Sequence, residues 1–227
     1  MCSRLKIMGM TASNRAEMQQ LYIIGPGRGK QEIPSGIVLG RNQECDIVVI
    51  VLPGISTDIS LNVTLEGEGA SVKLSGIYLC CSDERVNISV DLKHKAGHCT
   101  STQLFKGIVG GHARTSFHGK IVVAQDAQKT EAYQANHNLL LSTEARADSE
   151  PQLEIYADDV KCSHGATVGR LNEEEQFYMR SRGISLNKAR MLQIISFLAP
   201  VISEIRDERE REEISELVEL ALANVLD

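Results

Sequence analysis

Residues 153–171 read Leu-Glu-Ile-Tyr-Ala-Asp-Asp-Val-Lys-Cys-Ser-His-Gly-Ala-Thr-Val-Gly-Arg-Leu. Apolar and polar residues alternate around Leu153 and again around Val160, a pattern that predicts two half-buried strands joined by an acidic corner. Successive side chains of a strand point to opposite faces, so Cys162 and His164 are expected on the same face of a sheet. This stretch places a thiol and an imidazole side by side in a strongly patterned context.

The same period-two pattern extends upstream to Asp46. Ile59-Ser-Leu-Asn-Val-Thr-Leu65 alternates without a fault, which is typical of a half-buried strand, and residues 47–52 form a continuous apolar run typical of a strand buried on both faces. Gly, Asn, Asp and Ser residues separate these segments. Further strands are expected at 72–79, 86–92, 103–109, 117–123 and 139–142.

Many short strands with small turns are compatible with a sandwich, a barrel or a stacked solenoid. The chain has no Trp, four Phe and five Tyr, so its core must consist largely of Val, Ile, Leu and Ala, which suits the narrow interior of a coil. Small residues, Asn and His also recur at strand ends, where stacked coils superpose like residues. These features favour a solenoid, although the sequence shows no clean repeat of the kind that a solenoid should carry.

The two ends of the chain lack the alternating pattern of the strands. Residues 14–22 could form one short helix, and Gly25-Pro-Gly-Arg-Gly-Lys30 is a turn rather than a phosphate loop, because the glycine and the Ser/Thr that the loop requires are missing. After Leu171 the pattern becomes helical. We therefore expect a short N-terminal segment (1–44), a β core (45–171) and a helical domain (172–227).

Boundaries and faces of the helices can also be predicted. Asn172 followed by three glutamates is a suitable N-cap, Gly183 is expected to end that helix, and Ser185 is expected to open the next. Residues 206–213 are a charged run expected to face solvent. The apolar stripe of the second helix is expected to comprise Ala189, Leu192, Ile195, Ile202 and Ile205, and a further stripe runs from Ile214 to Val225.

Composition excludes some functions. The net charge of −6 offers no basic surface for nucleic acid. No apolar run is long enough for a transmembrane helix, and the first residues lack the pattern of a secretory signal, so we expect a cytoplasmic protein that does not enter the membrane. The six cysteines have no zinc-finger spacing and are expected to be free thiols in a reducing compartment.

Many residues of the chain together resemble the SufB/SufD family, over roughly residues 45–205. The residues that carry the resemblance are His94, Ser101, Gln103, Lys106-Gly107, Gly119-Lys-Ile121, Ala127-Gln128, Thr130, Asn136-His-Asn-Leu-Leu-Leu-Ser142, Ala145, Pro151, Leu153-Glu-Ile155, Asp158-Asp-Val-Lys-Cys-Ser-His-Gly-Ala-Thr-Val-Gly169, Phe177-Tyr178 and Ser181-Arg-Gly-Ile184. The resemblance implies a right-handed parallel β-helix, a small C-terminal α-helical domain, and a role as a non-enzymatic scaffold in iron–sulfur cluster assembly.

Two departures place the chain on the SufD-like branch. SufB-like members carry Glu-His-Glu where this chain reads Ser163-His164-Gly165, and they tend to have a cysteine in the segment that here spans 142–151 without one. By the resemblance, Cys162 and His164 would hold iron or a transient iron–sulfur cluster at the interface with a SufB-like subunit. Neither iron nor a cluster is expected on the isolated chain. The chain lacks most of the family's N-terminal helical region.

The resemblance also implies partners. Residues 172–227 match the region that docks a SufC-like ABC ATPase, and the β-helix would pair with the SufB-like subunit or, in its absence, with a second copy of the chain. The carboxylates of Asp158 and Asp159 leave a carbohydrate-active β-helix enzyme as an alternative, although such enzymes usually present aromatic platforms for sugar. A structural partner that binds no metal is the other alternative.

Ordinary structural roles compete with metal binding at each candidate residue. From the residues alone, Cys162 is more simply a small buried apolar side chain and His164 a hydrogen-bonded residue at a strand end. His94, His98 and Cys99 form a second grouping of possible ligands, but adjacent residues on a strand face opposite ways, which favours structural roles there. A thiolate and an imidazole are nevertheless the side chains that suit iron and iron–sulfur species.

Overall fold

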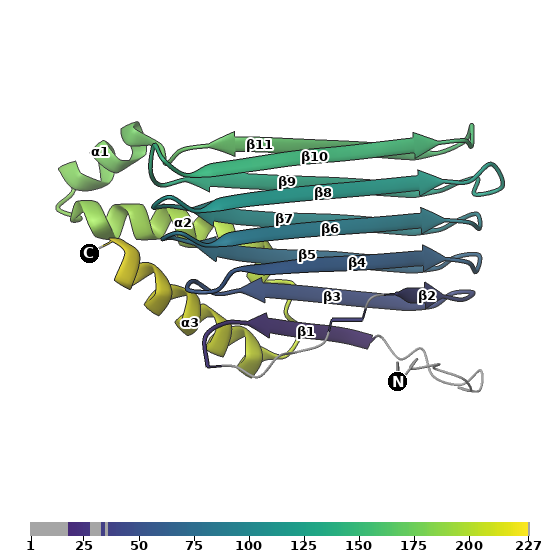
Figure 1. Ribbon diagram of the computed structural model, residues 1–227, viewed down its shortest axis with the longest axis horizontal. Helices are drawn as coiled ribbons and strands as arrows, with labels where there is room; N and C mark the ends of the chain where they lie inside the picture. Colours follow the sequence, from purple (N-terminus) through teal and green to yellow (C-terminus); the bar gives the residue numbers. More distant parts are fainter. Residues whose placement is uncertain (1–17, 28–32, 35, 227) are drawn as a thin grey trace.

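The computed structural model describes residues 18–27, 33–34 and 36–226, and it shows a stack of parallel strands with helices along one side (Figure 1). The strands alternate between two parallel sheets, so each coil contributes one strand to each. Sheet A has the order β1-β3-β5-β7-β9-β11, and sheet B has the order β10-β8-β6-β4-β2. This is the expected parallel β-helix followed by helices, and the predicted fold class is confirmed.

Most strands lie where the alternation predicted them, but the strand expected at 139–142 begins at Glu131 and ends at Leu140. The strands are β1 (Met18–Ile24), β2 (Ile37–Leu39), β3 (Glu44–Val51), β4 (Thr57–Leu65), β5 (Ser71–Cys80), β6 (Arg85–His94), β7 (Thr100–Val109), β8 (Arg114–Val123), β9 (Glu131–Leu140), β10 (Arg146–Ile155) and β11 (Lys161–Gly169).

The length of the coils varies, which hides the repeat in the sequence. Residues paired across adjacent strands of sheet A differ by 27 positions between Cys45 and Val72, by 29 between Val72 and Ser101, and by 31 between Ser101 and Ala132. Insertions in the turns absorb these differences while the strands stay in register. A repeat of fixed length therefore does not exist in this chain, even though every coil has the same architecture.

Inward-facing side chains of both sheets form the main core, which is mostly aliphatic. The large aromatic residues of this core are few: Tyr78, Phe105 and Phe117 are almost fully buried, and the two Phe rings lie with centroids 5.0 Å apart. Burial of this apolar surface supplies most of the favourable free energy of folding, at about 25 cal/mol per Å². The expected Val, Ile, Leu and Ala core of a narrow coil is the one observed.

The helices cover the outer face of sheet A and form a second core with it (Figure 1). They are α1 (Glu173–Ser181), α2 (Leu186–Ile202) and α3 (Glu208–Leu226). Outward-facing residues of the sheet such as Ile50, Ile77 and Ile108 pack with Leu198 and Val218. Strands β3 and β5 are thus buried on both faces over part of their length, as the continuous apolar run in β3 predicted.

Helix ends match the predicted capping residues. The Asn172 side chain accepts hydrogen bonds from the amides of Glu174 and Glu175, and the Ser185 side chain accepts one from Lys188. Gly183 has φ +86°, the left-handed conformation that glycine adopts at low cost after a helix.

Two other expectations were wrong in detail. Residues 18–22 of the expected N-terminal helix lie in β1, because this segment pairs with β3 at the end of sheet A; residues 14–17 lie outside the described residues. In α2 the fully buried face is Ala189, Ile194, Leu198 and Val201, whereas Leu192 is partly exposed. The sheet selects which side of an almost uniformly apolar helix becomes buried.

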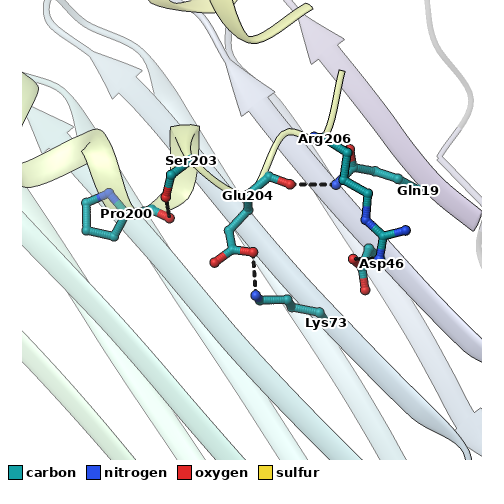
Figure 2. A network of polar contacts seen from close by, with 7 residues as sticks. All are labelled: Gln19, Asp46, Lys73, Pro200, Ser203, Glu204 and Arg206. Carbon is teal, nitrogen blue, oxygen red and sulfur yellow. Dashed lines mark hydrogen bonds and ion pairs between the residues drawn. The ribbon is translucent and has the colours of Figure 1, made fainter. Parts of the chain in front are cut away.

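Polar contacts fix the junction of α2 and α3 to the edge of sheet A (Figure 2). The Gln19 side chain donates to the carbonyl oxygen of Glu204 at 2.7 Å and accepts from the amide of Arg206 at 2.7 Å. The Arg206 guanidinium pairs with Asp46 at 2.6 Å, and Lys73 pairs with Glu204. The two hydrogen bonds of Gln19 join residues more than 180 positions apart in sequence, so they orient the helices on the solenoid.

Candidate functional site

Cys162 and His164 lie on β11, the last strand of sheet A. Their Cα partners on β9 are Ala132 and Gln134, which are both buried in the interior of the solenoid. The predicted arrangement on one face is therefore present, and that face points toward the interior axis of the coil. Cys162 is half-buried against the core, whereas His164 is exposed because no further coil covers it.

Strands β10 and β11 together form what we call the open end of the solenoid. Each is an edge strand with a neighbour on one side only. Apolar residues that would be inside a longer solenoid are exposed here, with Ile155 at 41% and Val168 at 48%. Pro151 lies in the middle of β10, a place that proline tolerates because an edge strand need not donate on its free side.

Edge strands expose unpaired backbone donors and acceptors, and proteins usually cover or block them. The open end combines such edges with exposed apolar side chains and the Cys162–His164 pair. On the outer faces, by contrast, β10 and β11 carry ion pairs such as Lys120 with Glu154 at 2.7 Å and Lys161 with Glu131 at 2.8 Å. The contrast marks the open end as the part of this coil suited to contact another protein.

The donor chemistry of the pair fits iron or an iron–sulfur cluster in part. Burial raises the pKa of the Cys162 thiol, and a hydrogen bond from the Ala132 backbone opposes this, so the thiol is protonated at neutral pH until a metal displaces the proton. Among the described residues, no three His, Cys, Asp or Glu side chains are grouped to hold a metal ion. The described residues therefore bring two suitable donors together, and a four-ligand site would need further donors from elsewhere.

The interior next to the open end is polar, a feature that the strand pattern did not predict. Gln134 Nε2 donates to Gln103 Oε1 at 2.9 Å. Asn136 donates to the Tyr78 hydroxyl at 2.9 Å, and that hydroxyl donates to Asn138 at 2.6 Å. On β3 the corresponding interior positions, Ile47, Val49 and Val51, are aliphatic. The sequence signal is a polar residue at the same place in consecutive coils, which becomes visible only when the coil lengths are known.

The second grouping of possible ligands is dispersed by the fold. His94 is buried in the interior and lies 2.9 Å from the Ser101 hydroxyl, whereas His98 occupies a turn with φ +57°. Cys99 is buried, and its thiol donates to the carbonyl oxygen of Gly67 at 3.3 Å. These residues have structural roles, as the sequence pattern favoured.

Burial lowers the pKa of His94 to about 4, so this side chain is neutral in the folded protein. In the unfolded chain its pKa is near 6.5, so acid favours unfolding. We expect this group to contribute stability in full above pH 6.5 and to lose about 3 kcal/mol of it as the pH falls to 4. Urea unfolding at several pH values gives the free energy of unfolding as a function of pH. Between pH 6.5 and 4 this free energy should fall less steeply in His94→Gln than in the unchanged chain.

The matched control for this prediction is His118→Gln, which changes an exposed histidine. An unchanged pH slope in His94→Gln, or an equal change in the two variants, would contradict the assignment to His94.

Asp158 and Asp159 occupy the turn between β10 and β11, as predicted. Asp159 pairs with Lys129, and its backbone carbonyl accepts a hydrogen bond from the Lys129 amide at 2.7 Å. One carboxylate of the acidic corner is thus engaged in closing the turn.

The expectations of free thiols and of no membrane-spanning helix can be compared with the residues that the structure describes. Cys45, Cys80, Cys81, Cys99 and Cys162 are free thiols, as expected for these five positions. Within the described part of the chain, no helix has the length and apolar character needed to cross a membrane.

A second exposed apolar surface lies on the helices. Phe177 is 73% exposed and Tyr178 is 59% exposed on α1, and Leu192 on α2 lies near Tyr178. Tyr178, Met179 and Leu192 line a shallow hollow of about 510 Å³ between the two helices. Large apolar side chains that gather on one surface are a common mark of a protein interface.

Comparison with known protein families identifies this architecture. The sequence profile of the SUF system FeS cluster assembly SufBD core domain matches residues 28–197. The chain belongs to the SufBD family. The match covers β2 to β11 and extends into α2, so both the open end and the α1–α2 surface lie within the region that the family shares.

Individual SufBD proteins show the same relationship. The chain is 45% identical to the iron–sulfur cluster assembly protein SufD of Escherichia coli over 144 residues, which is 63% of this chain and 34% of SufD. It is 35% identical to a SufBD family protein of Synechocystis over 75% of this chain and 38% of that protein. A SufBD family protein of Mycobacterium leprae is 31% identical over 80% of this chain and 48% of its own length.

The chain spans about a third to a half of the length of these curated relatives. The 45% identity to SufD agrees with the assignment to the SufD-like branch, which rested on Ser163 and Gly165 beside His164. This SufD-like chain accordingly belongs to the SufBD family of the SUF iron–sulfur cluster assembly system.

Proposed function

We propose that this SufD-like chain is a non-enzymatic scaffold subunit of a SUF assembly complex. Its β-helix pairs at the open end with a SufB-like subunit, and Cys162 and His164 provide ligands for iron or a nascent iron–sulfur cluster at that interface. The observation that carries the proposal is the position of these two residues: both face the interior axis of a solenoid that ends, uncovered, at their own strand.

The iron or cluster is the cargo of such a complex, and the geometry explains why a partner is needed to hold it. Iron–sulfur species are bound by four protein ligands in most sites, and this chain places two donors together. A subunit that continues the coil or faces its end would bring its own donors to the same axis. It would also cover His164 and exclude water from the ligands.

Apolar and backbone groups at the open end support the same pairing. Ile155 and Val168 flank the ligand pair, and burying them would add about 25 cal/mol per Å² of apolar surface removed from water. The free edges of β10 and β11 could form hydrogen bonds with strands of the partner. In the absence of the SufB-like subunit, a second copy of the chain presents the same edges and can occupy this end as a homodimer.

The helices offer a separate surface for the SufC-like ABC ATPase, within residues 172–227. Tyr178 of α1 lines the hollow that α1 and α2 enclose, and Phe177 is exposed on the same helix. Because α2 packs on the outer face of β7 and β5, movement of a bound ATPase would be transmitted to the strands that lead to the open end. This arrangement supports a role for the scaffold in coupling ATP hydrolysis to cluster handling.

The two alternatives make different demands on the surface. A carbohydrate-active β-helix enzyme needs a pair of available carboxylates across a groove, and Asp159 is held by Lys129. A structural partner without ligands needs only the apolar rim of the open end. The positions of Cys162 and His164 on the interior-facing side favour the ligand role over both alternatives.

One pull-down tests both interfaces of the proposal. Val168→Lys places a charge on the rim of the open end, and burying an unpaired charge at an interface costs several kcal/mol. We expect the tagged variant to lose the SufB-like subunit while it still retains the ABC ATPase. Co-purification of the three proteins, quantified by gel densitometry, measures this.

The matched control is Val38→Lys, which introduces the same charge at an exposed valine of β2, the terminal strand of sheet B at the other end. This variant should retain both partners. Retention of the SufB-like subunit by Val168→Lys, or loss of both partners together, would overturn the proposed arrangement of interfaces.

A further inference from the structure

Three polar residues occupy the same interior position in three consecutive coils. Gln103 on β7 pairs in register with Gln134 on β9, which pairs in register with His164 on β11. Side chains at paired positions of a parallel sheet point to the same face, so the three stack along the axis of the solenoid. The column begins with Gln20 on β1, and the two members between it and Gln103, Ile47 and Leu74, are aliphatic.

The fold fixes the amide of Gln134. Gln134 is 3% exposed, and its Nε2 donates to Gln103 Oε1 at 2.9 Å. The opposite sheet makes room for it at Gly119, where an added Cβ would lie 2.3 Å from Gln134 Nε2. A hydrogen bond on one side and a required glycine on the other hold the side chain in one place.

The other atom of the same amide has no partner. Gln134 Oε1 is buried without a hydrogen-bond partner in the structure, a condition that is unfavourable for a polar atom removed from water. Because Nε2 is used toward the Gln103 side, Oε1 remains for the next coil, and the residue in register there is His164. Adjacent strands lie about 4.8 Å apart, a gap that an imidazole spans by rotation about its two side-chain bonds.

We propose that Gln134 is a positioning residue for His164, with Gln134 Oε1 accepting the proton of one imidazole nitrogen. A neutral imidazole has one donor and one acceptor nitrogen, so this bond fixes the tautomer and directs the acceptor nitrogen toward the open end. Histidines that bind metals commonly donate their second ring nitrogen to such an oxygen. The inference rests on the proposed function in taking His164 as a ligand.

The test is ¹⁵N NMR of ring-labelled histidine in the metal-free full chain, with the His164 resonances assigned from His164→Gln. In the unchanged chain, His164 should show one protonated and one unprotonated ring nitrogen and slow exchange of the ring N–H with water. Gln134→Met, similar in shape but without an acceptor, should lose the slow exchange. Gln134→Glu, which keeps an oxygen acceptor, should restore it.

Gln103→Met is the matched control, because it removes the same Gln134–Gln103 hydrogen bond but leaves Gln134 Oε1 in place. Both methionine variants should lose a similar amount of thermal stability, and only Gln134→Met should change His164. Loss of the slow N–H in both, in neither, or its absence from the unchanged chain overturns the proposal. Because the measurement needs no metal or partner, it can succeed even if Cys162 and His164 prove dispensable for cluster assembly.

Discussion

Cys162→Ser combined with His164→Ala is expected to abolish retention of iron and cluster at the interface of a reconstituted complex, while the complex itself still assembles. Loss of a supporting hydrogen bond alone costs about 10–100-fold in metal affinity, and loss of both ligands from one subunit should cost more. The measurement is anaerobic reconstitution with iron and sulfide in the presence of the SufB-like subunit, followed by iron and sulfide analysis and visible absorption.

Two further variants make this result specific. Cys45→Ser changes a buried thiol far from the open end and should leave the cluster yield unchanged. Burial raises the pKa of the Cys45 thiol to about 11. The single variant His164→Ala should already reduce the cluster yield, because it removes one of the two proposed ligands. His164 is exposed and contributes little to folding, so the fold should be unchanged. Full cluster yield in the double variant would exclude Cys162 and His164 as ligands and favour a purely structural subunit.

Gly107→Ala should destabilise the fold by roughly 3 kcal/mol, at the upper end of the cost of overpacking a core. A Cβ at this position would lie 2.1 Å from Tyr78 Cε2 and 2.3 Å from Asn138 Oδ1. The added methyl group would therefore displace a fully buried ring and break the hydrogen bond between the Tyr78 hydroxyl and Asn138. Natural domains are stable by only about 5–15 kcal/mol, so the loss should be evident in chemical denaturation.

Gly165→Ala is the matched control for the substitution at residue 107. It makes the same change on the last strand, where an added Cβ meets no atom within 4 Å. This variant should unfold at the same urea concentration as the unchanged chain. Equal stability of the two variants would show that the interior relaxes around the Tyr78 ring far more easily than its packing indicates.

Most of the fold could be predicted because apolar–polar alternation and helix capping depend on only a few neighbouring residues. The alternation around Ile59 located β4, and Asn172 and Ser185 located helix starts through hydrogen bonds to nearby amides. The placement of β1 depends on pairing with β3, which no local pattern of Leu21 and Tyr22 could reveal. Spacing within one strand likewise placed Cys162 and His164 together correctly.

The neighbours of that pair could not be predicted in the same way. Gln103 and Gln134 are 31 positions apart, and Gln134 and His164 are 30 apart. Their relation depends on the length of two coils, and each coil length depends on how a turn is closed. Contacts between coils thus require the fold, whereas contacts within a strand require only the period of two.

The proposed pairing of two copies at the open end would limit how many copies can assemble. If two open ends meet about a two-fold axis, β10 and β11 of each copy face the same strands of the other, and His164 of both copies lies on the shared interior axis. A contact of this isologous kind closes after one pairing, whereas head-to-tail stacking would leave a free end after every addition. Pairing of like ends therefore gives a dimer, and pairing of the open end with the β1–β2 end of another copy would give a fibre.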